Sequence, residues 1–125
     1  MDDIREQAFR LFQQHAHEVG FLVREQLDKY ALYTVDRDGN VIGAALAEHD
    51  FGDVTIVHAI AVDETARGQG VAQSLVNEIV HDSPHTLLEA KCDVGLPANK
   101  FSQQTGWENV RQTGDGRMNV WHYAC

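Results

Sequence analysis

The spacing of apolar residues predicts four helical segments. Near the start of the chain, apolar side chains recur every three or four residues, which predicts an amphipathic helix over residues 3–18. Residues 22–28 favour a short second helix. The same helical period returns over residues 70–81, where one face is apolar throughout. Pro97 suits the first turn of a last helix, which we expect to run over residues 97–104 and to stop at Gly106.

Runs rich in β-branched and aromatic residues predict six strands, at residues 30–35, 41–47, 54–62, 86–90, 107–112 and 118–123. An Asp-Gly turn at residues 36–40 joins the first two strands into a hairpin, and a second turn is expected at residues 48–53. The third run is the longest and is largely apolar, which indicates a central place in the sheet. This order of elements predicts a single α/β domain over residues 1–125 with a mixed sheet.

Length and composition narrow the class of protein. A chain of 125 residues is long enough for one core and too short for two. It has no apolar run near the roughly 20 residues that span a bilayer. Its start lacks the basic-then-apolar order of a signal peptide, so we expect a cytoplasmic protein. The two cysteines are too few for a disulfide framework, and the histidines lack metal-ligand spacing, so no metal site is expected.

The charge of the chain is strongly acidic. It has 19 acidic and 10 basic side chains, a formal net charge of −9. Such a surface repels phosphate backbones, which argues against nucleic acid as a partner. It would attract a cationic acceptor such as an amine. The alternative is that the acidity only keeps the protein in solution.

A glycine-rich turn lies between the third predicted strand and the helix at residues 70–81. Gly68 and Gly70 let the backbone approach a ligand closely, and amide groups at a helix N-terminus favour an anion such as a phosphate. The alternative is a tight turn that binds nothing. The Lys-Ser/Thr pair of a P-loop does not follow Gly70, and the further glycine of a dinucleotide-binding fingerprint is missing. Both of those phosphate loops are therefore excluded.

The surroundings of this turn resemble a known family. The segment Arg67-Gly68-Gln69-Gly70-Val71-Ala72 resembles the Gln/Arg-x-x-Gly-x-Gly/Ala signature of the GNAT (Gcn5-related N-acetyltransferase) superfamily. Residues 97–107 are similar to that family's Ala-x-x-Phe-Tyr-x-x-x-Gly-Phe element, and the resemblance covers about residues 30–123. It implies a GNAT-like (acyl-CoA N-acyltransferase) fold: a mixed, mostly antiparallel sheet flanked by helices, with the family's first strand missing.

The resemblance also implies where acetyl-coenzyme A (acetyl-CoA) would bind. The amides of the glycine loop would grip its pyrophosphate, at Arg67, Gly68, Gln69, Gly70, Val71, Ala72 and Gln73. The preceding strand would pair with the pantetheine arm through Ile60, Ala61 and Val62, and a bulge would splay this strand from residues 87–89 to make room for the arm. Asn99 either contacts the coenzyme or is an ordinary residue on a helix surface.

Two positions bear on catalysis by direct attack of an amine on the thioester. His58 stands where the family commonly has a glutamate as general base, and a histidine can take a proton near neutral pH. The alternative is a histidine packed beside the cleft, with Glu89 as the reserve base. Ser102 stands where the family has its acidic tyrosine. Serine is a poor proton donor, so Ser102 either hydrogen-bonds the sulfur or is structural.

The sequence therefore predicts an enzyme, an acetyl-CoA-dependent N-acetyltransferase. Its acceptor would be a primary amine of a small molecule, a polyamine-like cation or a protein. It would act as a monomer or a homodimer, with neither nucleic acid nor membrane as a partner. Because Ser102 departs from the family pattern, the alternative is a non-catalytic acyl-CoA-binding or regulatory module with the same fold.

Overall fold

The computed structural model describes residues 3–15, 24–95, 99, 102–103 and 105–125. Its helices are α1 (Asp3–Gln14), α3 (Arg24–Lys29), the short 3₁₀ helix η1 (Glu64–Ala66) and α4 (Val71–Asp82). Its strands are β1 (Ala31–Arg37), β2 (Asn40–Phe51), β3 (Val54–Val62), β4 (Leu87–Asp93), β5 (Glu108–Gln112) and β6 (Met118–Ala124). Asn99, Ser102 and Gln103 are helical, and the rest of the helix expected over residues 97–104 lies outside the described residues.

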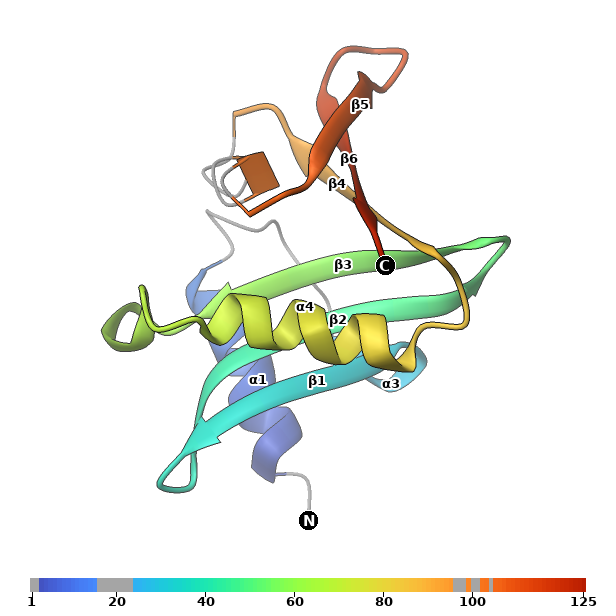
Figure 1. Ribbon diagram of the computed structural model, residues 1–125. Helices are drawn as coiled ribbons and strands as arrows, with labels where there is room; N and C mark the ends of the chain where they lie inside the picture. Colours follow the sequence, from blue (N-terminus) through green and yellow to red (C-terminus); the bar gives the residue numbers. More distant parts are fainter. Residues whose placement is uncertain (1–2, 16–23, 96–98, 100–101, 104) are drawn as a thin grey trace.

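The strands form one six-stranded sheet in the order β1-β2-β3-β4-β6-β5. β3 and β4 are parallel, and every other neighbouring pair is antiparallel. Figure 1 shows α4 on one face of the β1–β3 part of the sheet and α1 on the other. The expected mixed, mostly antiparallel sheet flanked by helices is confirmed. No helix in the described part of the chain combines the length and the apolar character needed to cross a membrane.

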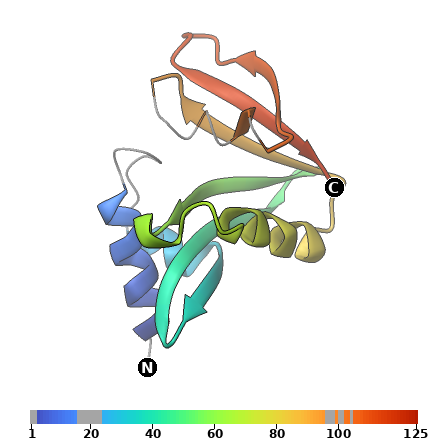
Figure 2. The same ribbon diagram turned by 60° about the vertical axis from the view of Figure 1, so that its left-hand side comes forward.

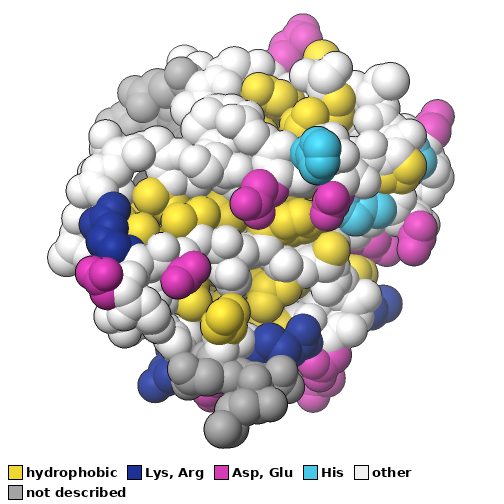
Figure 3. Space-filling model, turned by 60° about the horizontal axis from the view of Figure 1, so that its bottom comes forward, with side chains coloured by type: hydrophobic (Ala, Val, Ile, Leu, Met, Phe, Trp, Pro, Cys, Tyr) yellow, Lys and Arg dark blue, Asp and Glu magenta, His cyan; other side chains and the backbone are white. Residues whose placement is uncertain are grey.

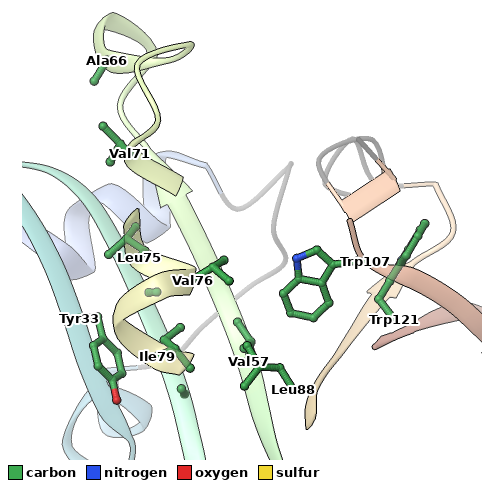
Figure 4. Packing of buried hydrophobic residues seen from close by; sticks show 12 residues of the cluster. Tyr33, Val57, Ala66, Val71, Leu75, Val76, Ile79, Leu88, Trp107 and Trp121 are labelled. Atoms are coloured by element: carbon green, nitrogen blue, oxygen red, sulfur yellow. The ribbon is translucent and has the colours of Figure 1, made fainter. Parts of the chain in front are cut away.

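Two apolar cores lie on the two faces of the sheet. On one face, Leu75, Val76 and Ile79 of α4 pack over β1–β4, and Figure 4 shows them pointing toward the strands. On the other face, Phe12 of α1 packs against Leu46 of β2. Each fully buried side chain of this size contributes about 1.5–3 kcal/mol by leaving water. Because side chains of β3 and α4 are buried in these cores, the two ends of the loop between β3 and α4 are held in place.

β3 contains a β-bulge at His58. Leu46 of β2 pairs with Ala59, and Ala47 pairs with Val57, so His58 is the extra residue between them. The bulge reverses the alternation of side chains along β3, because Val57 belongs to the core under α4 whereas Ala59 belongs to the core under α1. A bulge re-aims the local side chain and bends its strand.

The bulge lies where β3 and β4 separate. Within the described residues these strands pair only at Thr55↔Leu88 and Ile56↔Glu89, although both strands continue further. Figure 2 shows the result: β4, β6 and β5 swing away from β1–β3, and the two halves of the sheet open like a V. This gap between β3 and β4 is called the splay below.

A network of polar side chains connects the strands and α4 at the end of the molecule where β3 and β4 are paired. The Tyr33 hydroxyl lies 2.7 Å from His49 Nε2 and donates to Asp82 Oδ2 at 3.0 Å. His49 Nδ1 lies 3.1 Å from the Thr55 hydroxyl, which lies 2.7 Å from the Ser83 hydroxyl. Burial and the carboxylate of Asp82 raise the pKa of Tyr33, so its hydroxyl stays protonated. The network joins β1, β2, β3 and the end of α4 where β3 meets β4.

The turn expected at residues 48–53 is wrong. β2 runs on to Phe51, and the turn is confined to Gly52 and Asp53. The polar residues that suggested a turn have partners on neighbouring strands: Glu48 bonds His58, and His49 bonds Tyr33. Cross-strand polar pairs of this kind stabilise a strand that its composition alone disfavours.

Gly43 of β2 sets how closely α4 approaches the sheet. A Cβ at this position would clash with Val71 Cγ1 and lie 3.3 Å from Leu75 Cδ1. Valine is stiff at χ1, so the side chain that opens α4 cannot easily turn away. Gly43→Ala is therefore expected to lower the free energy of unfolding by about 1–3 kcal/mol in urea denaturation.

Gly114→Ala is the matched control for this prediction. A Cβ at Gly114 meets nothing within 4 Å, so the change should stay within about 0.5 kcal/mol. Equal stability of the two variants would contradict the close packing of α4 on β2.

Candidate active site

The turn after β3 is fixed by one carboxylate. Asp63 Oδ1 accepts hydrogen bonds from the Thr65 amide and the Thr65 hydroxyl, both at 2.9 Å. These bonds hold the pKa of Asp63 below its usual range. The capped turn forms η1 and delivers the chain to Arg67, the first residue of the glycine loop.

The glycine loop presents bare backbone to solvent. Gly68 and Gly70 both have φ near +79°, and a Cβ at either would meet nothing within 4 Å. The first bond of α4 runs from the Ser74 amide to the Gly70 carbonyl at 3.0 Å. The amides of Val71, Ala72 and Gln73 therefore have no acceptor within the helix. Together with the helix dipole they form a site suited to a phosphate.

The polar side chains of the loop brace it. Arg67 Nε donates to the Val62 carbonyl at 3.3 Å, and its Nη2 lies 3.1 Å from His15 Nδ1 on the segment after α1. Gln69 accepts from Arg37 Nη2 at 2.5 Å and donates to the Thr65 carbonyl at 3.4 Å. These side chains hold the loop against β1 and the end of α1, so its backbone remains available for a ligand.

The end of β3 turns one backbone edge toward the splay. The Asp63 amide donates to the Ile42 carbonyl of β2 at 2.8 Å. Backbone direction alternates along a strand, so the polar groups of Val62 and Ile60 point away from β2 and into the splay. Ala61 points its side chain into the core under α1. Gln73, the last of the residues expected to bind the pyrophosphate, lies on α4, and its side chain donates to Asn77 Oδ1 at 3.0 Å. Because the Val62 carbonyl already accepts from Arg67 Nε, the groups placed to pair with an extended ligand are the Val62 amide and the backbone of Ile60.

His58 is held in one orientation by two neighbours. Its Nε2 lies 3.0 Å from Glu48 Oε1, and its ring stacks on Tyr30 with centroids 4.3 Å apart and planes 16° apart. The two side chains are about one quarter exposed, at 24% for His58 and 23% for Glu48. A carboxylate accepts a hydrogen bond from a ring N–H, so Nε2 carries the proton and Nδ1 keeps a lone pair. This arrangement suits a general base.

A second histidine–carboxylate pair lies across the sheet on the same face. Glu89 Oε1 of β4 lies 3.0 Å from His122 Nε2 of β6. The register runs from Glu48 through Ile56 to Glu89, so the two pairs flank Ile56. The reserve base Glu89 is therefore a paired carboxylate, and its side chain is only 14% exposed.

Asn99 and Ser102 lie on the far side of the splay. Asn99 Oδ1 accepts from Trp121 Nε1 at 3.0 Å and from Asn119 Nδ2 at 3.1 Å, so this oxygen ties the last helical segment to β6. Ser102 is buried, and its carbonyl accepts the Trp107 amide at 3.2 Å. The bonds of Asn99 give it a structural task, and Ser102 shapes the turn that places Trp107.

Sequence reasoning missed Glu48 and Tyr30 as neighbours of His58. The sequence predicts a turn at Glu48 and a strand at Tyr30, whereas Tyr30 precedes β1 and Glu48 lies inside β2. A turn at Gly52 and Asp53 could have been read from the sequence as the tip of a hairpin. Such a hairpin places Glu48 and His58 on adjacent strands.

The molecule carries more acidic than basic side chains, 19 against 10. Figure 3 shows one face, where acidic side chains and histidines lie beside a band of hydrophobic side chains. With a net charge of −9, the molecule attracts cations over distances up to the Debye length, about 8 Å at physiological salt.

The splayed sheet, the glycine loop and the following helix together define the fold of the acyl-CoA N-acyltransferases. The chain belongs to the GNAT family of acetyltransferases: the family model described as "Acetyltransferase (GNAT) family" matches residues 1–107. None of the curated proteins compared with the chain matches it.

Solved structures share this fold at low sequence identity. A Gcn5-related N-acetyltransferase from Kribbella flavida superposes with a TM-score of 0.72 at 17% identity, covering 100% of this chain and 94% of that one. A GNAT family acetyltransferase from Elizabethkingia anophelis with acetyl-CoA bound has a TM-score of 0.65 at 16% identity, over 81% and 80% of the two chains. The ribosomal-protein-S18-alanine N-acetyltransferase of Escherichia coli has a TM-score of 0.66 at 17% identity, over 96% and 85%.

Proposed function

We propose that this protein transfers an acetyl group from acetyl-CoA to a primary amine, with His58 as the general base. The observation that carries the proposal is the placement of His58. It occupies the β-bulge beside the splay, bonded to Glu48 and stacked on Tyr30, with Nδ1 left to accept a proton. A base must lie within hydrogen-bond reach of the proton it takes, directly or through one water.

The residues of the loop and of β3 fit acetyl-CoA. The open amides from Gly68 to Gln73 would hold its pyrophosphate, because Gly68 and Gly70 put no side chain in the way. The backbone of Ile60 and the Val62 amide would pair with the amide groups of the pantetheine arm. Acetyl-CoA supplies a thioester whose carbonyl carbon is open to attack by an amine.

His58 and Glu48 would handle the proton of the amine. As the C–N bond forms and the C–S bond breaks, Nδ1 of His58 takes the proton that the amine loses. Glu48 stabilises the imidazolium that results, as the carboxylate of a catalytic triad does. Serine is a weak acid, so the leaving thiolate would take its proton from solvent rather than from Ser102.

The acceptor is best sought among cations. The acidic surface attracts an ammonium, and Glu48 and Glu89 place two carboxylates on the face of the sheet that carries His58. This argument favours a primary amine on a cationic small molecule, a polyamine-like compound or a protein.

The test is acyl transfer to a panel of amines, followed by the release of free thiol from acetyl-CoA. The panel should include diamines and polyamines, amino acids and peptides with free N-termini. Turnover with at least one cationic amine, above the rate of thioester hydrolysis, is the expected result. Tight binding of the coenzyme without turnover across the panel would favour the alternative, a non-catalytic acyl-CoA-binding module.

A further inference from the structure

Trp107 carries a buried hydrogen-bond donor without a partner. The residue is only 6% exposed, and within the described part of the chain its Nε1 is the one buried side-chain nitrogen or oxygen that makes no hydrogen bond. Trp121, the other tryptophan, donates its Nε1–H to Asn99 at 3.0 Å. Buried donors are almost always satisfied in folded proteins, so an orphaned indole N–H calls for a partner that binds later.

The indole of Trp107 is fixed from two sides. Its backbone amide donates to the Ser102 carbonyl at 3.2 Å, and its ring packs on Tyr123 of β6 with centroids 5.3 Å apart. The ring belongs to the apolar core that also contains Val76 of α4 and Val57 of β3. A donor held this firmly cannot swing out to reach water.

The free nitrogen lies on the edge of the ring that is turned toward α4 and β3. Figure 4 shows the indole on the far half of the sheet, with its nitrogen on the side of Val76. β3 and β4 do not pair with each other beyond Ile56 and Glu89 (Figure 2), so the ring and the end of β3 lie on opposite sides of the splay. The backbone edge of β3 at Ile60 and Val62 faces the splay from the opposite side.

We propose that Trp107 Nε1–H donates a hydrogen bond to a carbonyl oxygen of the acyl-pantetheine arm of the coenzyme, which lies in the splay. This inference rests on the proposed function. The arm carries two amide carbonyls and, when acetylated, a thioester carbonyl. Trp107 would hold the arm from the β4 half of the sheet, while β3 pairs with it from the other half. Trp107 and β3 would thus contact the arm from opposite sides of the splay.

The experiment uses the indole N–H signals of the ¹⁵N-labelled protein. The chain has two tryptophans, so two indole signals are expected, and Trp121→Phe assigns them by removing one. Addition of coenzyme A should move the Trp107 signal downfield in the proton dimension, because a new hydrogen bond deshields the proton. The Trp121 signal should stay nearly still, because its bond to Asn99 already exists.

A fragment of the coenzyme separates the arm from the nucleotide. 3′-Phospho-ADP carries the phosphates without the arm, so it should move backbone amides of the glycine loop and leave the Trp107 indole signal in place. Movement of that signal with the fragment alone would overturn the assignment to the arm. Trp107→Phe keeps an aromatic ring and removes the donor, and it should weaken coenzyme A binding about two- to tenfold, the range for a neutral hydrogen bond.

The possible failures are distinguishable. If coenzyme A moves neither the loop amides nor the indole signal, the proposed function fails along with this inference. If the loop amides move and the Trp107 signal does not, only the role of Trp107 is overturned. The measurement on the unaltered protein decides this even if Trp107→Phe fails to fold.

Discussion

His58→Gln is expected to lower kcat for acyl transfer by about 10²- to 10⁴-fold, the contribution of a positioned general base. Glutamine keeps a polar side chain of similar reach beside Glu48 but cannot take a proton from the amine. Coenzyme A affinity should change little, because the glycine loop and the end of β3 do not depend on the imidazole. Initial rates with a saturating amine and binding measured by calorimetry separate the two effects.

His122→Gln is the matched control for this prediction. His122 is a second histidine bonded to a glutamate on the same face of the sheet, at the same 3.0 Å distance. It lies on β6, whereas His58 lies in the bulge of β3, one of the two strands that border the splay. The control variant should keep most of its kcat. A loss in His122→Gln equal to that in His58→Gln would contradict the choice of base.

Much of the fold could be predicted from the sequence because its signals are local. The period of apolar residues predicts α4 and β3 to within one residue at each end, and the glycine loop lies between them as expected. The prediction for the end of β2 is wrong, because what keeps Glu48 and His49 in a strand is their bonding to His58 and Tyr33 on neighbouring strands. The amino-acid composition of one segment does not reveal hydrogen bonds to other strands.

The candidate site was less predictable, since its geometry depends on register and packing. The resemblance placed His58 near the cleft, but the bulge that aims it comes from the pairing of Leu46 and Ala47 with β3, which a single strand does not reveal. Likewise, Trp107 reads as a core aromatic in the sequence. Only the packing shows that its ring is buried while its N–H is left without an acceptor in the described part of the chain.

Gly70→Ala is expected to weaken coenzyme A binding about tenfold or more. Gly70 has φ +79°, and a methyl group there costs about 1–2 kcal/mol in the left-handed region. The methyl would also stand on the open surface where the pyrophosphate approaches the amides of α4. Hydrogen bonds to a charged group contribute about 1.5–3 kcal/mol each. Misaligning one of them therefore accounts for about a tenfold loss of affinity, which calorimetry can measure.

Gly52→Ala separates the effect on binding from the effect on folding. Gly52 also has positive φ, at +64°, and a Cβ there likewise meets nothing within 4 Å. It lies in the turn before β3, whereas the glycine loop follows the other end of that strand, roughly 25 Å away. Both variants should lose similar stability in urea, and only Gly70→Ala should lose affinity for coenzyme A. Equal affinities in the two variants would mean that the amides at the start of α4 do not hold the pyrophosphate.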